Sequence, residues 1–208
     1  MATVLTASEQ KVILHNVRWE TYESLLADHV ASSAPRFTYD RGELEIMSPS
    51  SQHEEYNRTI SLFVEVLAEE LNIDIRNLGS ATFKREDLER GFEPDSCFYI
   101  QNEQQVTGKT RIDLNIDPPP DLVIEIDITS PSINKIPIYA HLRVPQVWRY
   151  DGNRVLILHL ENDGYSERDE SAVLPPVTAA LVTGYLEDSK TMKRTAWLRK
   201  LRAWARTV

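Results

Sequence analysis

The stretch that most constrains the fold is PDLVIEIDITSPSINK, at residues 120–135. Its middle, from Asp121 to Ile128, alternates like a β-strand, because successive strand side chains point to opposite faces. One predicted face is entirely apolar and consists of Leu122, Ile124, Ile126 and Ile128. The other predicted face carries three carboxylates beside Val123, namely those of Asp121, Glu125 and Asp127.

Three carboxylates at alternate strand positions repel one another, and this leaves two interpretations of the acidic face. An exposed antiparallel strand would keep the carboxylates in water at little cost. A partly buried strand would need a compensating cation, and carboxylate oxygens suit hard divalent ions. The stretch alone favours neither interpretation over the other.

Length and composition indicate a globular chain. The 208 residues suffice for one full core, so we expect a single domain over 1–208, with its core at 18–160 and a C-terminal helical extension at 177–208. No apolar run of about eighteen residues suggests a membrane span, and the N-terminus lacks the pattern of a secretory signal. The only cysteine, Cys97, excludes an intramolecular disulfide and fits a reducing cytoplasm.

Charge is distributed unevenly along the chain. The net charge is −9, yet residues 189–208 hold seven basic residues and no acidic ones, so the first 188 residues carry −16 and the last 20 carry +7. An acidic body argues against a generally basic nucleic-acid binder. We interpret the basic end as a docked helix with a solvated cationic face rather than a dedicated DNA-reading helix. Its predicted apolar stripe consists of Trp197, Leu201 and Trp204.

Hydrophobic periodicity and turn residues predict an α+β fold, with helices and strands mixed along the chain. The predicted helices span 18–30, 52–72, a short segment after residue 135, 178–186 and 192–206. The predicted strands are a hairpin at 36–47 and segments at 95–100, 121–128, 144–150 and 155–160. Residues 101–110 and 161–170 are polar and predict surface loops.

His53 and Glu54 fall in the first turn of the strongest predicted helix. HEEYN begins like the zinc-protease motif, but Asn57 stands where the second histidine would be, so that motif is excluded. We therefore interpret both residues as helix-start chemistry, because a glutamate there is favoured by the helix dipole.

Four segments taken together resemble the restriction-endonuclease-like superfamily with its PD-(D/E)xK pattern. They are closest to a bacterial branch formerly described as a domain of unknown function. The segments, in chain order, are PRFTYDRGELEIMSPSSQHE at 35–54, EPDSCFYI at 93–100, PDLVIEIDITSPS at 120–132 and KIPIYAHLRVPQVWRYDG at 135–152. The resemblance implies a restriction-endonuclease-like core, in which a central mixed β-sheet is flanked by helices.

The resemblance also implies the site residues. Asp95 follows Pro94 as the PD pair, and Glu125 is the acidic residue 30 positions later. The pattern would place lysine at 127, where this chain has Asp127, and the branch often supplies the lysine from the following helix, which here is Lys135. Asp127 could then be a third metal ligand, a partner of Lys135, or a sign of lost activity. Lys135 could also be an ordinary surface lysine.

By the same resemblance, Asp95 and Glu125 would hold Mg²⁺ or Mn²⁺, and Lys135 would orient water or stabilise the transition state. The implied function is a metal-dependent endonuclease acting on DNA, in the form of a homodimer. We expect the apolar hairpin at 145–160 or Trp197 and Trp204 to form the dimer surface. The basic end, or a dimer cleft lined by Lys84 and Arg85, would approach the nucleic acid. The alternatives are a catalytically degenerate module that binds nucleic acid or regulates, and an unrelated α+β protein.

Overall fold

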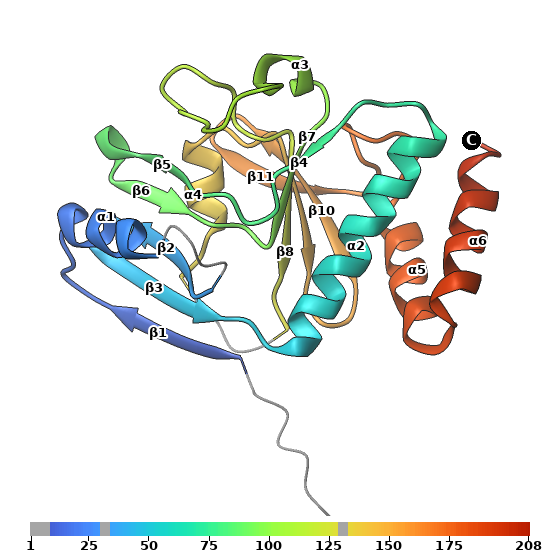
Figure 1. The fold of residues 1–208 in the computed structure, drawn as a ribbon, viewed down its shortest axis with the longest axis horizontal. Coiled ribbons are helices and arrows are strands. Elements are labelled where there is room, and N and C mark those ends of the chain that lie inside the picture. The colour runs from blue at the N-terminus through green and yellow to red at the C-terminus, as the bar shows by residue number, and fades with distance from the viewer. Residues whose placement is uncertain (1–8, 30–33, 129–132) are drawn as a thin grey trace, which may run out of the picture.

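The computed structural model describes residues 9–29, 34–128 and 133–208. Two β-sheets form its frame, as Figure 1 shows. The first is antiparallel, with the strand order β1-β3-β2-β6-β5. Its strands are β1 (Gln10–Leu14), β2 (Arg36–Asp40), β3 (Glu43–Ser48), β5 (Phe83–Arg85) and β6 (Arg90–Phe92), with the 3₁₀ turn η1 (Glu86–Leu88) between β5 and β6. The predicted hairpin at 36–47 is thus β2 and β3, and its turn places Arg41 and Gly42 at positive φ.

The second sheet is mixed and has the strand order β11-β10-β9-β8-β7-β4. Its strands are β4 (Arg76–Asn77), β7 (Ser96–Tyr99), β8 (Leu122–Ile126), β9 (Gln146–Tyr150), β10 (Val155–Glu161) and β11 (Gly164–Arg168). Strand β8 runs antiparallel to β7 and parallel to β9. The central mixed sheet expected from the sequence is therefore confirmed. The strands predicted at 95–100, 121–128 and 144–150 lie side by side in it as β7, β8 and β9.

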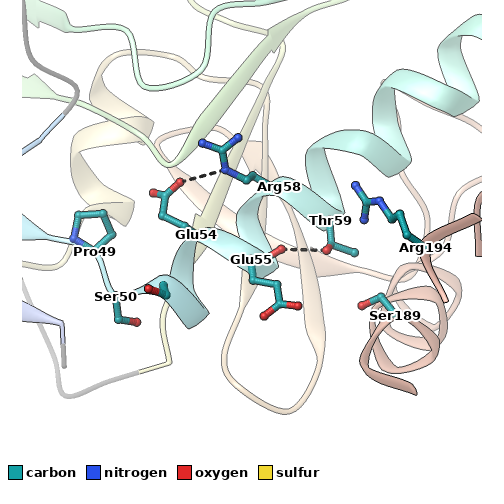
Figure 2. A pocket seen from close by; sticks show the side chains of 9 residues that line it. Pro49, Ser50, Glu54, Glu55, Arg58, Thr59, Ser189 and Arg194 are labelled. Carbon is teal, nitrogen blue, oxygen red and sulfur yellow. Dashed lines mark hydrogen bonds and ion pairs between the residues drawn. The ribbon is translucent and has the colours of Figure 1, made fainter. Parts of the chain in front are cut away.

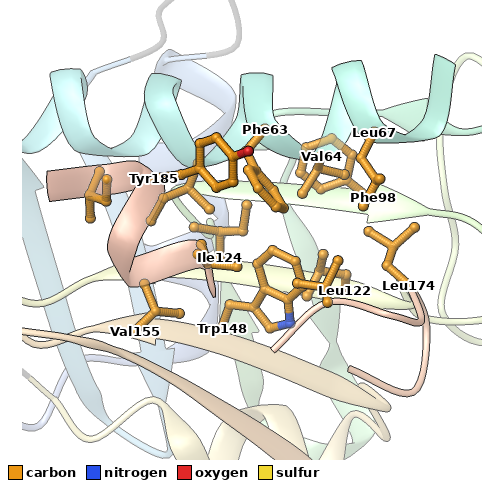
Figure 3. Close-up of a cluster of buried hydrophobic side chains, with 14 of the residues drawn as sticks. Phe63, Val64, Leu67, Phe98, Leu122, Ile124, Trp148, Val155, Leu174 and Tyr185 are labelled. Atoms are coloured by element: carbon orange, nitrogen blue, oxygen red, sulfur yellow. The ribbon is translucent and has the colours of Figure 1, made fainter. Parts of the chain in front are cut away.

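Three helices cover one face of the mixed sheet: α2 (Ser51–Glu70), α5 (Ala179–Thr191) and α6 (Arg194–Ala205). Figure 3 shows the apolar core between them and the sheet, with Phe63 and Leu67 of α2 above Ile124 and Trp148. Ile124 and Ile126 are buried in this core, which confirms the predicted apolar face of their strand. Helix α2 begins where Ser50 accepts a hydrogen bond from the backbone N–H of His53, as an N-cap residue does.

The opposite face of the mixed sheet packs against α4 (Ile136–His141), the short α3 (Glu103–Val106) and strands β5 and β6 of the first sheet. Val123 and Cys97 lie in this second core, together with Tyr139 of α4. Helix α1 (Trp19–Asp28) packs on the first sheet through Trp19 and Tyr22. Both faces of β8 are consequently buried.

The exposed-strand interpretation of residues 121–128 is wrong. Strand β8 lies inside the sheet between two neighbours, and all five of its residues are buried. It ends at Ile126, so Asp127 and Ile128 lie beyond the strand. The continuous apolar run, broken only by Glu125, is typical of a strand covered on both faces.

Two predicted loops contain regular structure. Residues 161–170 include strand β11, which pairs with β10, and residues 101–110 include helix α3. Both segments are polar and lack a clear apolar period, because β11 is an edge strand and α3 is only one turn long. No helix among the described residues is long and apolar enough to cross a membrane.

The C-terminal helix is docked, as predicted. Trp197 and Leu201 of α6 are fully buried in the main core, and Trp204 packs against it. Arg202 and Arg206 form ion pairs with Glu70 of α2. Because Trp197 is buried within the chain, the expectation that it forms a dimer surface is wrong.

Candidate active site

Asp95 directly precedes strand β7 and lies opposite Glu125 of the neighbouring strand β8. Strands β7 and β8 pair with Ser96 opposite Ile124, and continuing this register by one residue sets Asp95 opposite Glu125. The backbone N–H of Ile126 donates to Asp95 Oδ2 over 2.7 Å, which holds the Asp95 carboxylate against the end of β8. Both residues are buried, at 2% and 7% exposure. The structure therefore brings together the two carboxylates that the resemblance implied.

Lys135 reaches the same place from the start of α4. It occupies the N-cap position of that helix, as expected, and its Nζ donates to Glu125 Oε2 over 2.8 Å. Tyr139, one turn further along α4, donates its hydroxyl hydrogen to Glu125 Oε1. The Lys135 side chain is only 11% exposed, so it is not an ordinary surface lysine. Its catalytic role stays a prediction.

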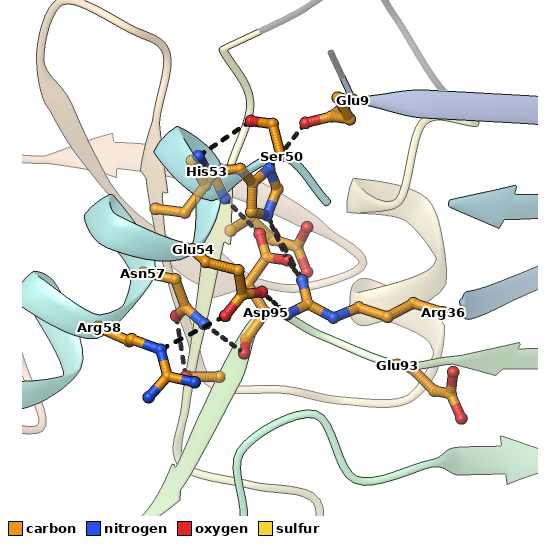
Figure 4. A network of polar contacts seen from close by, with 12 residues as sticks. Glu9, Arg36, Ser50, His53, Glu54, Asn57, Arg58, Glu93 and Asp95 are labelled. Atoms are coloured by element: carbon orange, nitrogen blue, oxygen red, sulfur yellow. Dashed lines mark hydrogen bonds and ion pairs between the residues drawn. The ribbon is translucent and has the colours of Figure 1, made fainter. Parts of the chain in front are cut away.

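The sequence reasoning missed Arg36 and His53, which contact Asp95, and Glu9, which contacts His53 (Figure 4). His53 Nε2 lies 2.7 Å from Asp95 Oδ1, and its Nδ1 lies 2.8 Å from Glu9 Oε2. Arg36 of β2 donates to both Asp95 and Glu54. A signal was present, because Arg36, His53 and Glu54 all fall within the family-like segment at 35–54. We missed this signal because we interpreted His53 and Glu54 only as helix-start residues.

The electrostatics of this cluster keep its members charged. Burial opposes a charged His53, but the hydrogen bonds to Asp95 and Glu9 outweigh burial and raise the pKa of His53 to about 9. Burial likewise opposes a charged Asp95, but His53, Arg36 and Lys135 lower the pKa of Asp95 to about 2. Burial also opposes a charged Lys135, yet the charges of Glu125, Asp95 and Glu45 raise the pKa of its ammonium. Glu45 is a further buried carboxylate, contributed by β3.

Glu125 differs from Asp95. Burial raises the pKa of Glu125, Lys135 counteracts this, and the negative charge of Asp95 raises it again. The repulsion between the two carboxylates is therefore not fully neutralised by the cations around them. A cation between two carboxylates would relieve it.

Asp127 lies apart from this cluster. Its carboxylate is about 29% exposed and pairs with Arg149 of β9 at 2.8 Å. Of the three options for Asp127, a partnership with Lys135 is therefore wrong, because Lys135 bonds to Glu125 and Asp127 to Arg149. At the position where the motif has its lysine, this chain therefore has an aspartate that forms an ion pair just after the end of β8.

The donor set fits a magnesium ion bound by two carboxylates. The described residues contain no group of three or more His, Cys, Asp or Glu side chains arranged to hold a metal ion. Mg²⁺ commonly takes only one or two protein carboxylates and completes its shell with water and substrate phosphates. A carboxylate oxygen can accept two hydrogen bonds, and each Glu125 oxygen accepts one from the described residues, as does Asp95 Oδ2. Asp95 Oδ1 already contacts both His53 and Arg36, so Oδ2 is the Asp95 oxygen with room for a metal ion. Asp95 and Glu125 are thus the residues that would hold such an ion.

The fold and this site together define a nuclease-like α+β protein. A crystal structure described as "a putative nuclease belonging to DUF820" from Anabaena variabilis matches with a TM-score of 0.54 and 16% identity, covering 82% of this chain and 99% of that one. The family model described as "Putative restriction endonuclease" (Uma2) matches residues 19–184, and the chain belongs to that family. A search among curated proteins found no match.

Proposed function

We propose that this chain is an endonuclease that hydrolyses phosphodiester bonds of DNA with the help of Mg²⁺ or Mn²⁺, in the cytoplasm. The observation that carries the proposal is the convergence of Lys135, Glu125 and Asp95 in one buried cluster. A buried lysine ammonium near two buried carboxylates is an arrangement that suits phosphoryl chemistry.

Each side chain has a distinct role in this proposal. A divalent ion bound by Asp95 and Glu125 would lower the pKa of a bound water and neutralise phosphate charge. Lys135 donates one of its three N–H groups to Glu125, so the others can bind a phosphate oxygen or the attacking water. Tyr139 fixes the other oxygen of Glu125, so the carboxylate cannot rotate away from Asp95.

A second candidate function is a degenerate module that binds nucleic acid without cutting it. Two observations favour it: Asp127 stands at the lysine position of the motif, and Arg36 contacts the Asp95 carboxylate that would hold the metal. Cleavage of DNA decides between the two functions, because binding alone is common to both.

The deciding measurement is nicking of supercoiled plasmid. With Mg²⁺, the wild-type chain is expected to relax the plasmid, and a chelator is expected to stop it. Glu125→Gln is expected to cut about a hundredfold more slowly or worse, because it loses a metal-binding carboxylate. Glu167→Gln is the matched control, since Glu167 is half-exposed on β11 and pairs with Arg154, away from Asp95 and Glu125. Plasmid left intact by the wild type would make the degenerate module the better proposal.

We also propose a homodimer, but through a different surface from those expected. Val155 and Ile157 of the 145–160 hairpin are buried in the core. Exposed apolar side chains instead occupy edge strand β1, where Val12 is 53% exposed and Leu14 is 43% exposed. Identical edge strands can pair about a two-fold axis. Light scattering at micromolar concentration is expected to give twice the chain mass for the wild type and a single chain mass for Val12→Lys. Equal masses for both proteins would contradict this surface.

A further inference from the structure

The basic charges of the C-terminal segment divide into two groups. Four of the seven bond to acidic side chains, in the pairs Lys190–Glu187, Lys200–Asp188, Arg202–Glu69 and Arg206–Glu70. The first pair lies within α5, the second joins α5 to α6, and the two arginine pairs hold α6 on α2. The other three are Lys193, Arg194 and Arg199, which have no acidic partner among the residues that the structure describes. Docking of the helix therefore accounts for only part of the positive charge.

Arg194 shares a pocket with Arg58. The pocket has a volume of about 530 Å³ and lies between the first half of α2 and the junction of α5 with α6. Figure 2 shows Arg58 and Arg194 over α2, with Thr59 drawn between them. The Arg58 side chain is 79% exposed, and its acidic contact, Glu54, lies 3.7 Å away. The Arg194 guanidinium packs over the ring of the buried Trp197, 5.3 Å from its centroid, which limits where it can point.

This pocket is next to the candidate active site. Glu54 forms part of its wall, and the Glu54 carboxylate accepts a hydrogen bond from Arg36. Arg36 in turn contacts Asp95. Two side chains therefore separate the pocket from a proposed metal-holding carboxylate. Phosphates recur about every 3.4 Å of helix axis along one DNA strand, so a strand with one phosphate at Asp95 has others close by.

We propose that Arg58 and Arg194 bind backbone phosphates of the DNA strand that flanks the scissile bond, an inference that rests on the proposed function. A guanidinium presents its N–H groups as a planar fork that matches phosphate oxygens. Arg58 lies within residues 19–184, which the family model matches, whereas Arg194 of α6 lies outside them. The proposed contact also explains how a chain with a net charge of −9 approaches a polyanion.

The pocket contains one opposing charge, which makes the proposal sharper. Glu55 is exposed on its wall, whereas Glu54 is neutralised by Arg36. A phosphate bound between Arg58 and Arg194 would be repelled by Glu55. Removal of the glutamate charge and removal of the arginine charges should therefore change DNA affinity in opposite directions.

The test measures binding without cleavage, in the Glu125→Gln background. Fluorescence anisotropy of a labelled duplex of about 20 base pairs, two helical turns, follows binding over a range of salt concentrations. Arg58→Ala and Arg194→Ala are each expected to weaken binding several-fold and to reduce the salt slope by about one. Glu55→Gln is expected to strengthen binding. Arg199→Ala is the matched control, because Arg199 is an exposed arginine of α6 outside the pocket.

The outcomes separate this inference from the proposed function. Loss of affinity in the two pocket variants but not in Arg199→Ala supports the inference, whether or not the wild type nicks plasmid. Equal losses in all three arginine variants would show a diffuse charge effect and overturn it. Unchanged binding in Arg58→Ala and Arg194→Ala would overturn it as well, even for an active nuclease. Arg194→Lys should keep most of the affinity, because it keeps the charge.

Discussion

Lys135→Ala is expected to lower the rate of DNA cleavage by about 10²–10³-fold while leaving DNA affinity nearly unchanged. The reason is that the Lys135 ammonium is held at 2.8 Å from Glu125 and kept protonated by the surrounding carboxylates. The remaining N–H donors of Lys135 would bind phosphate oxygens whose negative charge increases in the transition state, so their loss slows cleavage more than it weakens binding. Single-turnover nicking gives the rate, and anisotropy gives the affinity.

The control for this prediction is Lys109→Ala. Lys109 also bonds to a buried aspartate, Asp117, but it lies in the loop after α3, away from Asp95 and Glu125. The Lys109→Ala variant should cut DNA at the wild-type rate. Lys135→Met preserves the aliphatic volume and guards against a loss of folding. If Lys135→Met cuts as fast as the wild type, Lys135 has no catalytic role.

The second large effect concerns stability and pH. The pKa of His53 is about 9 in the folded chain and 6.5 in the unfolded one. The folded state therefore holds this proton more tightly, and the stabilisation is complete below pH 6.5. It is lost as pH rises through about 9, which lowers the free energy of unfolding by about 3 kcal/mol. Urea unfolding of the metal-free protein across this range measures the loss.

His53→Gln is the control for the pH effect. Glutamine can still donate to one of the two carboxylates, Asp95 or Glu9, through its amide nitrogen, but carries no proton to lose in this range. The variant should be less stable than the wild type at pH 6.5, and the difference should shrink towards pH 9. Comparing the two proteins removes the contribution of Cys97, whose thiol pKa is also raised by burial. Parallel curves for the two proteins would contradict the assignment to His53.

Much of the fold could be predicted because its signals are local. The period of about 3.6 residues in α2 and the alternation in β8 arise from side chains that each element buries on its own face. Gly42 marked the hairpin turn, since its positive φ favours glycine. The strands at 95–100 and 121–128 entered the central sheet as expected.

Elements whose burial depends on distant partners could not be predicted. Strand β11 is polar and is ordered by pairing with β10. Strands β5 and β6 are three residues long each and are ordered by pairing with each other and, for β6, with β2. Lys84 and Arg85 of β5 pair with Glu23 and Asp87, and their place in a dimer cleft stays a prediction. None of these partners is visible in a local hydrophobic pattern.

The sequence by itself indicated the two carboxylates and the lysine of the candidate site, through its resemblance to a known family. The resemblance to the PD-(D/E)xK pattern implied Asp95 and Glu125, and the branch that the chain resembles implied Lys135 at the start of the following helix. Only the tertiary structure decided that β8 is buried on both faces and that Arg36 and His53 close over Asp95. The physical reason is that alternation along a strand shows which side chains share a face, but not which other segment packs against that face. Which charges meet across sheets depends on packing between segments more than forty residues apart, as in the pair of His53 and Asp95.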